Sequence, residues 1–275
     1  MPIALALVLT LVSACAQDLG YLLQHAVAAS VAPLSIRRPA ASIRSLLGRR
    51  RWLVGMGVQI GGFALYVVAL ALAPLSLVQA AAAGGIGILA IMVSRVTKVP
   101  LTRRERIGAA VSVAGLALLG VSLFSSHAEG SGATDLWVAA WLGGSAAAAA
   151  GCLLLLRRAI GRAAARGIAS GILFAAGDVA TKVAVSGTAA DFAYLACLVA
   201  FYGLGTVVLQ AAFQHGGALT TAGLSTLLTN ALPIVAGTVL FHEPVPHGVL
   251  GAARLAAFAA VVAGAVLLGM KKAEV

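Results

Sequence analysis

The chain has 275 residues, of which 61% are hydrophobic and only 10% carry a charge, whereas a soluble domain is about 25% charged. A soluble enzyme, a nucleic-acid-binding domain and a disordered tail are therefore excluded, because too few charged side chains are available to cover a water-facing surface. The net charge of +11 is interpreted as a topology signal. The chain is expected to be an all-α polytopic membrane protein, embedded in the lipid bilayer.

Apolar runs separated by charged or turn-forming residues predict about nine transmembrane helices. No Lys or Arg precedes the first run, so a span is expected there rather than a cleaved leader. Ala73 and Pro74 interrupt a longer apolar run, because a proline ends or kinks a helix. The approximate spans are 3–31, 52–72, 75–94, 107–124, 136–156, 167–186, 192–213, 218–240 and 248–268.

The basic residues predict the orientation. Nearly all of the 19 Lys and Arg residues fall in the loops 34–51, 95–106 and 157–166 and in the C-terminal segment. Nine spans place all of these segments on one side of the membrane. The positive-inside rule then puts the N-terminus outside and the C-terminus in the cytoplasm. The membrane is expected to be the plasma membrane.

An internal repeat is predicted from the order of similar segments. Asp18 and Asp178 each stand inside an apolar helix after a run of small residues, and Gly-Ala-Ala at 108–110 recurs at 251–253. The chain therefore divides into a first four-helix repeat (1–124), a linker with one transmembrane helix (125–166) and a second four-helix repeat (167–275). Five membrane crossings separate the start of the first repeat from the start of the second, so the two repeats begin on opposite sides of the membrane. This is an inverted-topology repeat.

This pattern resembles the drug/metabolite transporter superfamily of the EamA type, and its halves resemble the small multidrug resistance proteins. Asp18 and Asp178 stand where those half-size proteins carry one acid in their first helix. The stretch LYVVALALAPLSLVQAAAAGGIGILAIM is similar to the second and third helices of the family, and LPIVAGTVLFHEPVPHGVLGAARLAAFAAVVAGAVLL, with Pro233 and Glu243, is similar to its ending. The first half also resembles the NIPA-type magnesium transporters. The resemblance implies a transporter.

Ionisable side chains inside the spans are the first candidates for a substrate or proton site, because a charge at the centre of the bilayer costs about 2.5–3.5 kcal/mol. Asp18 has no basic neighbour one turn away and is the candidate proton site. Asp178 and Lys182, four residues apart on one helix, form either a structural pair or part of the site. Arg254 lies about two turns from the end of its span, where it either snorkels to the interface or contributes to the site.

Uncharged polar residues add further candidates. Thr221, Ser225 and Thr229 recur every four residues on one face of a span, which indicates either helix–helix hydrogen bonds or a polar lining. Pro233 frees a backbone carbonyl on the same helix. Thr226 and Asn230 widen this polar face, and Gln24 and Gln79, on other spans, are further candidates for the substrate site.

Small residues predict close helix packing at two places, Gly57 with Gly61 and the run 80–85. Cys15, Cys152 and Cys197 lie singly in apolar runs and are interpreted as small core residues. No catalytic constellation, metal site or cofactor is expected.

The favoured function is a secondary transporter that carries a small polar metabolite or drug by alternating access, with protons as the coupling ion. Two acids and two bases within the spans balance in charge, which suits a zwitterion or a polar metabolite better than a divalent cation. The alternatives are a divalent-cation, magnesium-like permease and a non-transporting assembly or scaffold component of the membrane.

Overall fold

The computed structural model describes residues 2–31, 44–82, 85–98, 100–123, 134–185, 193–242 and 248–269, and within these ranges the regular structure is helical. Six helical segments are long and apolar enough to cross a membrane. They are Ile3–Ala28, Arg50–Leu72, Asp135–Arg158, Arg162–Val185, Ala193–Phe213 and Ala218–Val239. The chain is therefore an all-α membrane protein, as its composition predicts.

Helices occupy the ranges that the sequence assigned to spans. In chain order they are α1 (Pro2–Ala28), α3 (Arg50–Leu72), α4 (Leu75–Ala82), α5 (Gly85–Thr97), α6 (Arg103–Leu123), α7 (Asp135–Leu154), α8 (Arg162–Val185), α9 (Ala193–Phe213), α10 (Ala218–Val239) and α11 (Val249–Gly269), with a short 3₁₀ helix, η1, at Leu156–Arg158. The predicted span 75–94 contains both α4 and α5, on either side of residues 83–84, which lie outside the described residues. The count of nine spans stays a prediction.

Local sequence explains where several helices begin and end. Ala73 is extended between α3 and α4, directly before Pro74, so the proline separates the two helices as predicted. Before α6, the Thr102 hydroxyl accepts a hydrogen bond from the Glu105 backbone N–H at 3.2 Å, and the Glu105 carboxylate accepts one from the Thr102 N–H at 2.8 Å. This reciprocal arrangement is a capping box.

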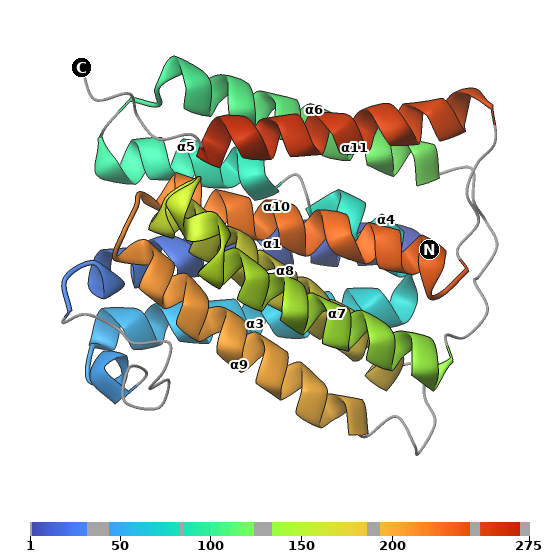
Figure 1. The fold of residues 1–275 in the computed structure, drawn as a ribbon, viewed down its shortest axis with the longest axis horizontal. Helices are drawn as coiled ribbons and strands as arrows, with labels where there is room; N and C mark the ends of the chain where they lie inside the picture. Colours follow the sequence, from blue (N-terminus) through green and yellow to red (C-terminus); the bar gives the residue numbers. More distant parts are fainter. Residues whose placement is uncertain are drawn as a thin grey trace.

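Figure 1 shows the helices as a bundle whose members run roughly along one direction. Among the described residues, α1 packs along α3, and α8 packs between α9, α10 and α7. The pair α6 and α11 lies side by side along one edge of the bundle. The most deeply buried helix is α8, most of whose side chains are inaccessible to solvent. Asp178 therefore lies at the centre of the bundle.

Close helix crossings occur at glycines other than Gly57 and Gly61, and the predicted packing run 80–85 lies partly outside the described residues. A Cβ atom on Gly57 or Gly61 would meet no atom within 4 Å, whereas one on Gly55 would lie 3.0 Å from the carbonyl oxygen of Gly20. Gly62 also faces α1, near Ala16. The prediction for Gly57 and Gly61 is wrong because glycine spacing does not say which face of a helix meets its neighbour, and α1 contacts the opposite face of α3.

The polar stripe of α10 is a packing surface against α8. A Cβ on Gly171 would lie 2.5 Å from the carbonyl oxygen of Ser225. The Ser170 hydroxyl donates to the Ser225 hydroxyl at 3.0 Å, and the Thr229 hydroxyl donates to the Gly171 carbonyl of α8 at 3.4 Å. The packing alternative for this stripe is therefore the one that the described contacts support.

The close contact between α8 and α10 predicts that replacing glycine by alanine has opposite effects on stability at Gly171, inside the contact, and at Gly57, outside it. Gly171→Ala should lower the free energy of unfolding by about 1–3 kcal/mol, because the added methyl group overpacks the contact with α10. Gly57→Ala should raise it by about 0.5–1 kcal/mol, because alanine is the better helix former and the site is open. Reversible unfolding of both purified variants tests this. Equal stability of the two variants would contradict the close contact of α8 with α10 at Gly171.

Candidate functional site

Asp178 lies at the meeting point of four helices. Its carboxylate accepts a hydrogen bond from the Gln79 amide nitrogen of α4 at 2.9 Å and another from the Tyr202 hydroxyl of α9. The Tyr66 hydroxyl of α3 accepts from Gln79 and also hydrogen-bonds to the carboxylate. Asp178 and Gln79 are almost fully buried, with 2% and 1% of their surfaces exposed. These four residues are called the Asp178 cluster.

Aromatic rings surround this cluster. The ring centroids of Phe63 and Tyr202 are 4.8 Å apart in an edge-to-face arrangement, and those of Phe174 and Tyr202 are 5.7 Å apart. Glycines make room for the rings, since a Cβ on Gly177 would collide with Tyr202 and one on Gly205 with Phe174. The rings exclude water, which strengthens the hydrogen bonds to the buried carboxylate.

Asp18 is the second buried acid, with 1% of its surface exposed. Its Oδ2 atom is buried without a hydrogen-bond partner among the described residues. The phenol of Tyr21, one turn further along α1, is buried near both Asp18 and Asp178. Tyr21 thus connects the environments of the two acids. A buried carboxylate oxygen without a donor is unfavourable unless it binds a proton or a cation.

A second polar network, called the glutamine ladder, joins Gln24 of α1, Gln59 of α3 and Gln210 of α9. The Gln24 amide donates to Gln59 at 2.6 Å, and the Gln210 amide donates to Gln24. The Trp52 indole N–H donates to Gln210 at 3.2 Å, and Tyr21 hydrogen-bonds to Gln59. The ladder therefore runs from Tyr21 toward the end of the bundle where α3 begins.

Lys182 contacts the end of α3. Its ammonium nitrogen donates to the carbonyl oxygens of Leu70 at 3.0 Å and Ala73 at 3.4 Å. The last carbonyls of a helix lack intrahelical donors and carry partial negative charge, and Pro74 has no N–H to offer them. The described contacts of Lys182 and Asp178 thus go to different partners, although both residues tie α8 to α3.

These contacts predict that Lys182→Met lowers the free energy of unfolding by about 1–2 kcal/mol, because methionine keeps the length but leaves the carbonyls of α3 without the donor. Lys98→Met, at an exposed position after α5, is the matched control and should change stability little. Chemical or thermal unfolding of the purified variants measures both. If the two substitutions change the free energy of unfolding equally, the Lys182 ammonium does not stabilise the end of α3.

The other predicted site residues fall into three groups. Gln24 and Gln79 lie in the two polar networks. Thr229 and Asn230 lie on α10, where the Thr229 hydroxyl also reaches the Gly171 carbonyl at 3.4 Å and Asn230 is buried. The Thr226 hydroxyl is buried without a partner among the described residues. The side chain of Arg254 and the whole of Glu243 lie outside the part of the chain that the structure describes.

Sequence reasoning missed the tyrosines and two of the glutamines. The missed residues of the polar networks are Tyr21, Tyr66, Tyr202, Gln59, Gln210 and Trp52. A tyrosine or glutamine inside an apolar span was the available signal, since a buried hydroxyl or amide needs a hydrogen-bond partner.

Comparison with known proteins adds no relative to this description: no family model, no curated protein and no solved structure matches the chain.

Proposed function

We propose that this protein is a secondary transporter of the plasma membrane that moves a small polar metabolite or drug by alternating access, coupled to protons through Asp18. The substrate site of this proposal is centred on the Asp178 cluster. Lys182, Thr226, Thr229 and Asn230 are candidates for its borders, and Arg254 stays a candidate from the sequence.

The observation that carries the proposal is that Asp178 joins the two predicted halves of the chain. The acid and Tyr202 belong to the second half, whereas Tyr66 and Gln79 belong to the first. A carboxylate inside a membrane is costly and marks a functional site by default. Relative rocking of the halves would separate these donors from the carboxylate and open a polar site near the midplane.

The glutamine ladder supports the same boundary. Gln210 of the second half bonds to Gln24 and Trp52 of the first half. Hydrogen bonds between helices in membranes are individually weak, about 0.6 kcal/mol on average. Contacts of this strength hold two halves together and still allow them to exchange between arrangements.

The pattern of helix packing supports the predicted inverted repeat. The first two helices of each half pack on each other, α1 on α3 and α8 on α9. The last helices of the halves, α6 and α11, form a pair across the boundary. A two-fold relation between the halves would produce this pattern, and it is the architecture of many secondary transporters.

The charges favour a zwitterionic or polar solute. Lys182 lies one turn of α8 from Asp178, so rearrangement of the bonds of these two side chains would offer an ammonium group and a carboxylate to a substrate that carries both signs. The Tyr66 and Tyr202 hydroxyls and the Gln79 amide would add neutral donors and acceptors. Precise polar groups in an apolar enclosure are typical of small-molecule sites.

A binding screen tests the proposed site. A ligand that binds only the folded state raises the unfolding temperature, so the purified protein is heated with a panel of amino acids, amines and small polar drugs. We expect at least one solute to stabilise the parent and not the Gln79→Leu variant. Asp135→Asn, at an exposed carboxylate that bonds to Tyr194, should respond like the parent. Stabilisation of all three by the same solute would contradict the proposed site.

A further inference from the structure

A cavity of about 420 Å³ lies between α5 and α6, beside the basic segment 95–106, and neither of the two acids lines it. Its volume is in the range of small-molecule sites, about 300–1,000 Å³. Apart from one guanidinium group its wall is apolar. The residues that line it are Ala90, Leu101, Arg106, Ala109, Ala110, Val113 and Ala114.

The wall on α6 is one face of that helix. Arg106, Ala110 and Val113 are spaced by four and three residues, so their side chains lie above one another. From Arg106 to Ala114 the helix rises about 12 Å, close to the depth of one leaflet of a hydrocarbon core about 30 Å thick. Ala110 and Ala114 are exposed, whereas Ala109 is buried. The cavity is therefore a groove open along its length.

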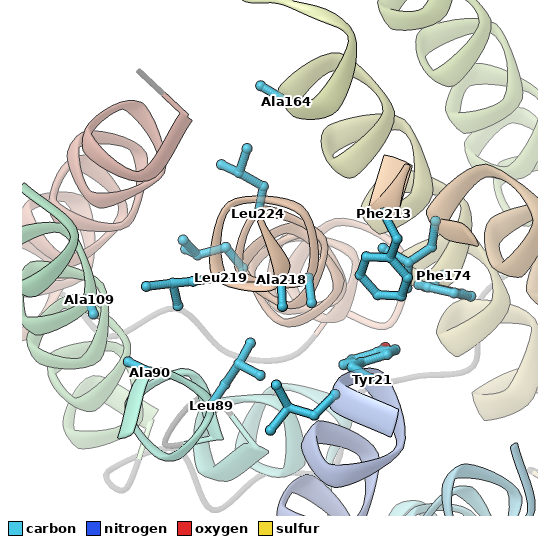
Figure 2. Close-up of a cluster of buried hydrophobic side chains, with 14 of the residues drawn as sticks. Tyr21, Leu89, Ala90, Ala109, Ala164, Phe174, Phe213, Ala218, Leu219 and Leu224 are labelled. Carbon is cyan, nitrogen blue, oxygen red and sulfur yellow. The ribbon is translucent and has the colours of Figure 1, made fainter. Parts of the chain in front are cut away.

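The floor of the groove belongs to the core of the bundle. Ala90 and Ala109, both buried, come from neighbouring helices at the edge of the main hydrophobic cluster (Figure 2). The opposite face of α6 is occupied by α11, because a Cβ on Gly264 would meet the Gly108 carbonyl and the Ser112 hydroxyl. The groove is thus a separate surface from the α6–α11 contact.

The charge at the basic end of the groove selects its occupant. Arg106 is exposed there, and Glu105, the single acid of segment 95–106, is engaged with Thr102 in the capping box of α6. Arg103 and Arg104 precede it and are also exposed. An apolar groove of leaflet depth that ends at exposed guanidinium groups is complementary to an acyl chain that carries an anionic head group.

We infer that this groove binds one anionic phospholipid, with an acyl chain along α6 and its phosphate at Arg106. Burying the chain contributes about 0.8 kcal/mol for each methylene group removed from water. Every lipid in a bilayer gains the same free energy from its buried acyl chains, so this gain does not favour an anionic lipid. The preference comes from the arginines, each of which contributes about 1 kcal/mol to the binding free energy when it lies near the phosphate. The inference does not depend on the proposed transport.

The test measures lipid retention on the purified protein in detergent. Phosphatidylglycerol and phosphatidylcholine are added in turn, and native mass spectrometry counts the lipids bound. The parent should retain one phosphatidylglycerol in preference to phosphatidylcholine. Arg106→Gln should lower the affinity for phosphatidylglycerol about fivefold, the equivalent of about 1 kcal/mol. Ala110→Leu, which fills the groove and keeps the arginine, should lower the retention of both lipids.

Arg158→Gln is the matched control, because this arginine is also exposed but belongs to η1 and does not line the groove. It should bind phosphatidylglycerol like the parent. Glycerol phosphate at the same concentration should not displace the lipid, since it lacks an acyl chain. Equal retention of both lipids by the parent, or a loss in Arg158→Gln as large as in Arg106→Gln, would overturn the inference. Displacement by glycerol phosphate would show a phosphate site in its place.

Discussion

Replacing Asp178 by leucine is expected to lower the free energy of unfolding by about 2–5 kcal/mol. The substitution leaves three buried donors, on Tyr66, Gln79 and Tyr202, without their acceptor. A buried donor without a partner costs about 1–3 kcal/mol in proteins generally, and a hydrogen bond between helices in a membrane contributes about 0.6–1.7 kcal/mol. Unfolding of the parent and the variant in the same detergent measures the difference.

A double-mutant cycle separates the hydrogen bonds from simple loss of packing. Tyr202→Phe removes one donor and keeps the ring against Phe63 and Phe174. In the parent this change should be destabilising. In the Asp178→Leu background it should be neutral or stabilising, because it removes a donor that already lacks an acceptor. Equal costs in both backgrounds would show that the carboxylate and the phenol do not act as one unit.

Replacing Asp18 by asparagine is expected to abolish uptake that a pH gradient drives and to leave the protein folded. Asparagine keeps the size and polarity of the side chain but binds and releases no proton, so the gradient can no longer drive the solute. Exchange of labelled for unlabelled solute at equal pH should persist, because exchange needs no net proton movement. Both modes are measured in the same proteoliposomes.

The matched control for this substitution is Asp135→Asn. Asp135 is exposed at the start of α7, where it bonds to Tyr194 at 2.9 Å, so its loss should not affect coupling. If Asp18→Asn accumulates solute across a pH gradient like the parent, Asp18 does not couple protons. If exchange is lost together with accumulation, the acid belongs to the substrate site instead.

The fold class could be predicted because it depends on composition and on the length of apolar runs. Both are properties of a single segment and can be read from its residues alone. A transmembrane helix satisfies its own backbone hydrogen bonds, so it can be predicted without knowledge of its neighbours. The end of α3 at Pro74 was predictable for the same reason, since the constraint acts within one residue.

Which face of each helix meets which neighbour could not be predicted. Gly55 and Gly57 differ by two positions, about 200° around the helix, and only the neighbouring helix decides which one tolerates a side chain. The same limit applied to Lys182, which the sequence places one turn from Asp178. Its partners are carbonyl groups more than a hundred residues away, and no pattern in the sequence identifies them.

The acids of the candidate site could be predicted, and their partners could not. Asp18 and Asp178 stand out because a charge is costly inside a span. Tyr66 and Tyr202 look like ordinary aromatic core residues until Asp178 is placed between them. The stripe on α10 left both packing and a polar lining open from sequence, and the contact of Ser225 with Gly171 of α8 supports packing.

Solute flux through the reconstituted protein tests the central claim most directly. Liposomes with the parent, with the Asp178→Asn variant and without protein are loaded identically, and uptake of the solute found in the binding screen is followed with and without an inward proton gradient. The proposal predicts gradient-dependent accumulation by the parent alone. Accumulation no faster than in protein-free liposomes, or equal accumulation by Asp178→Asn, would contradict transport through the Asp178 cluster.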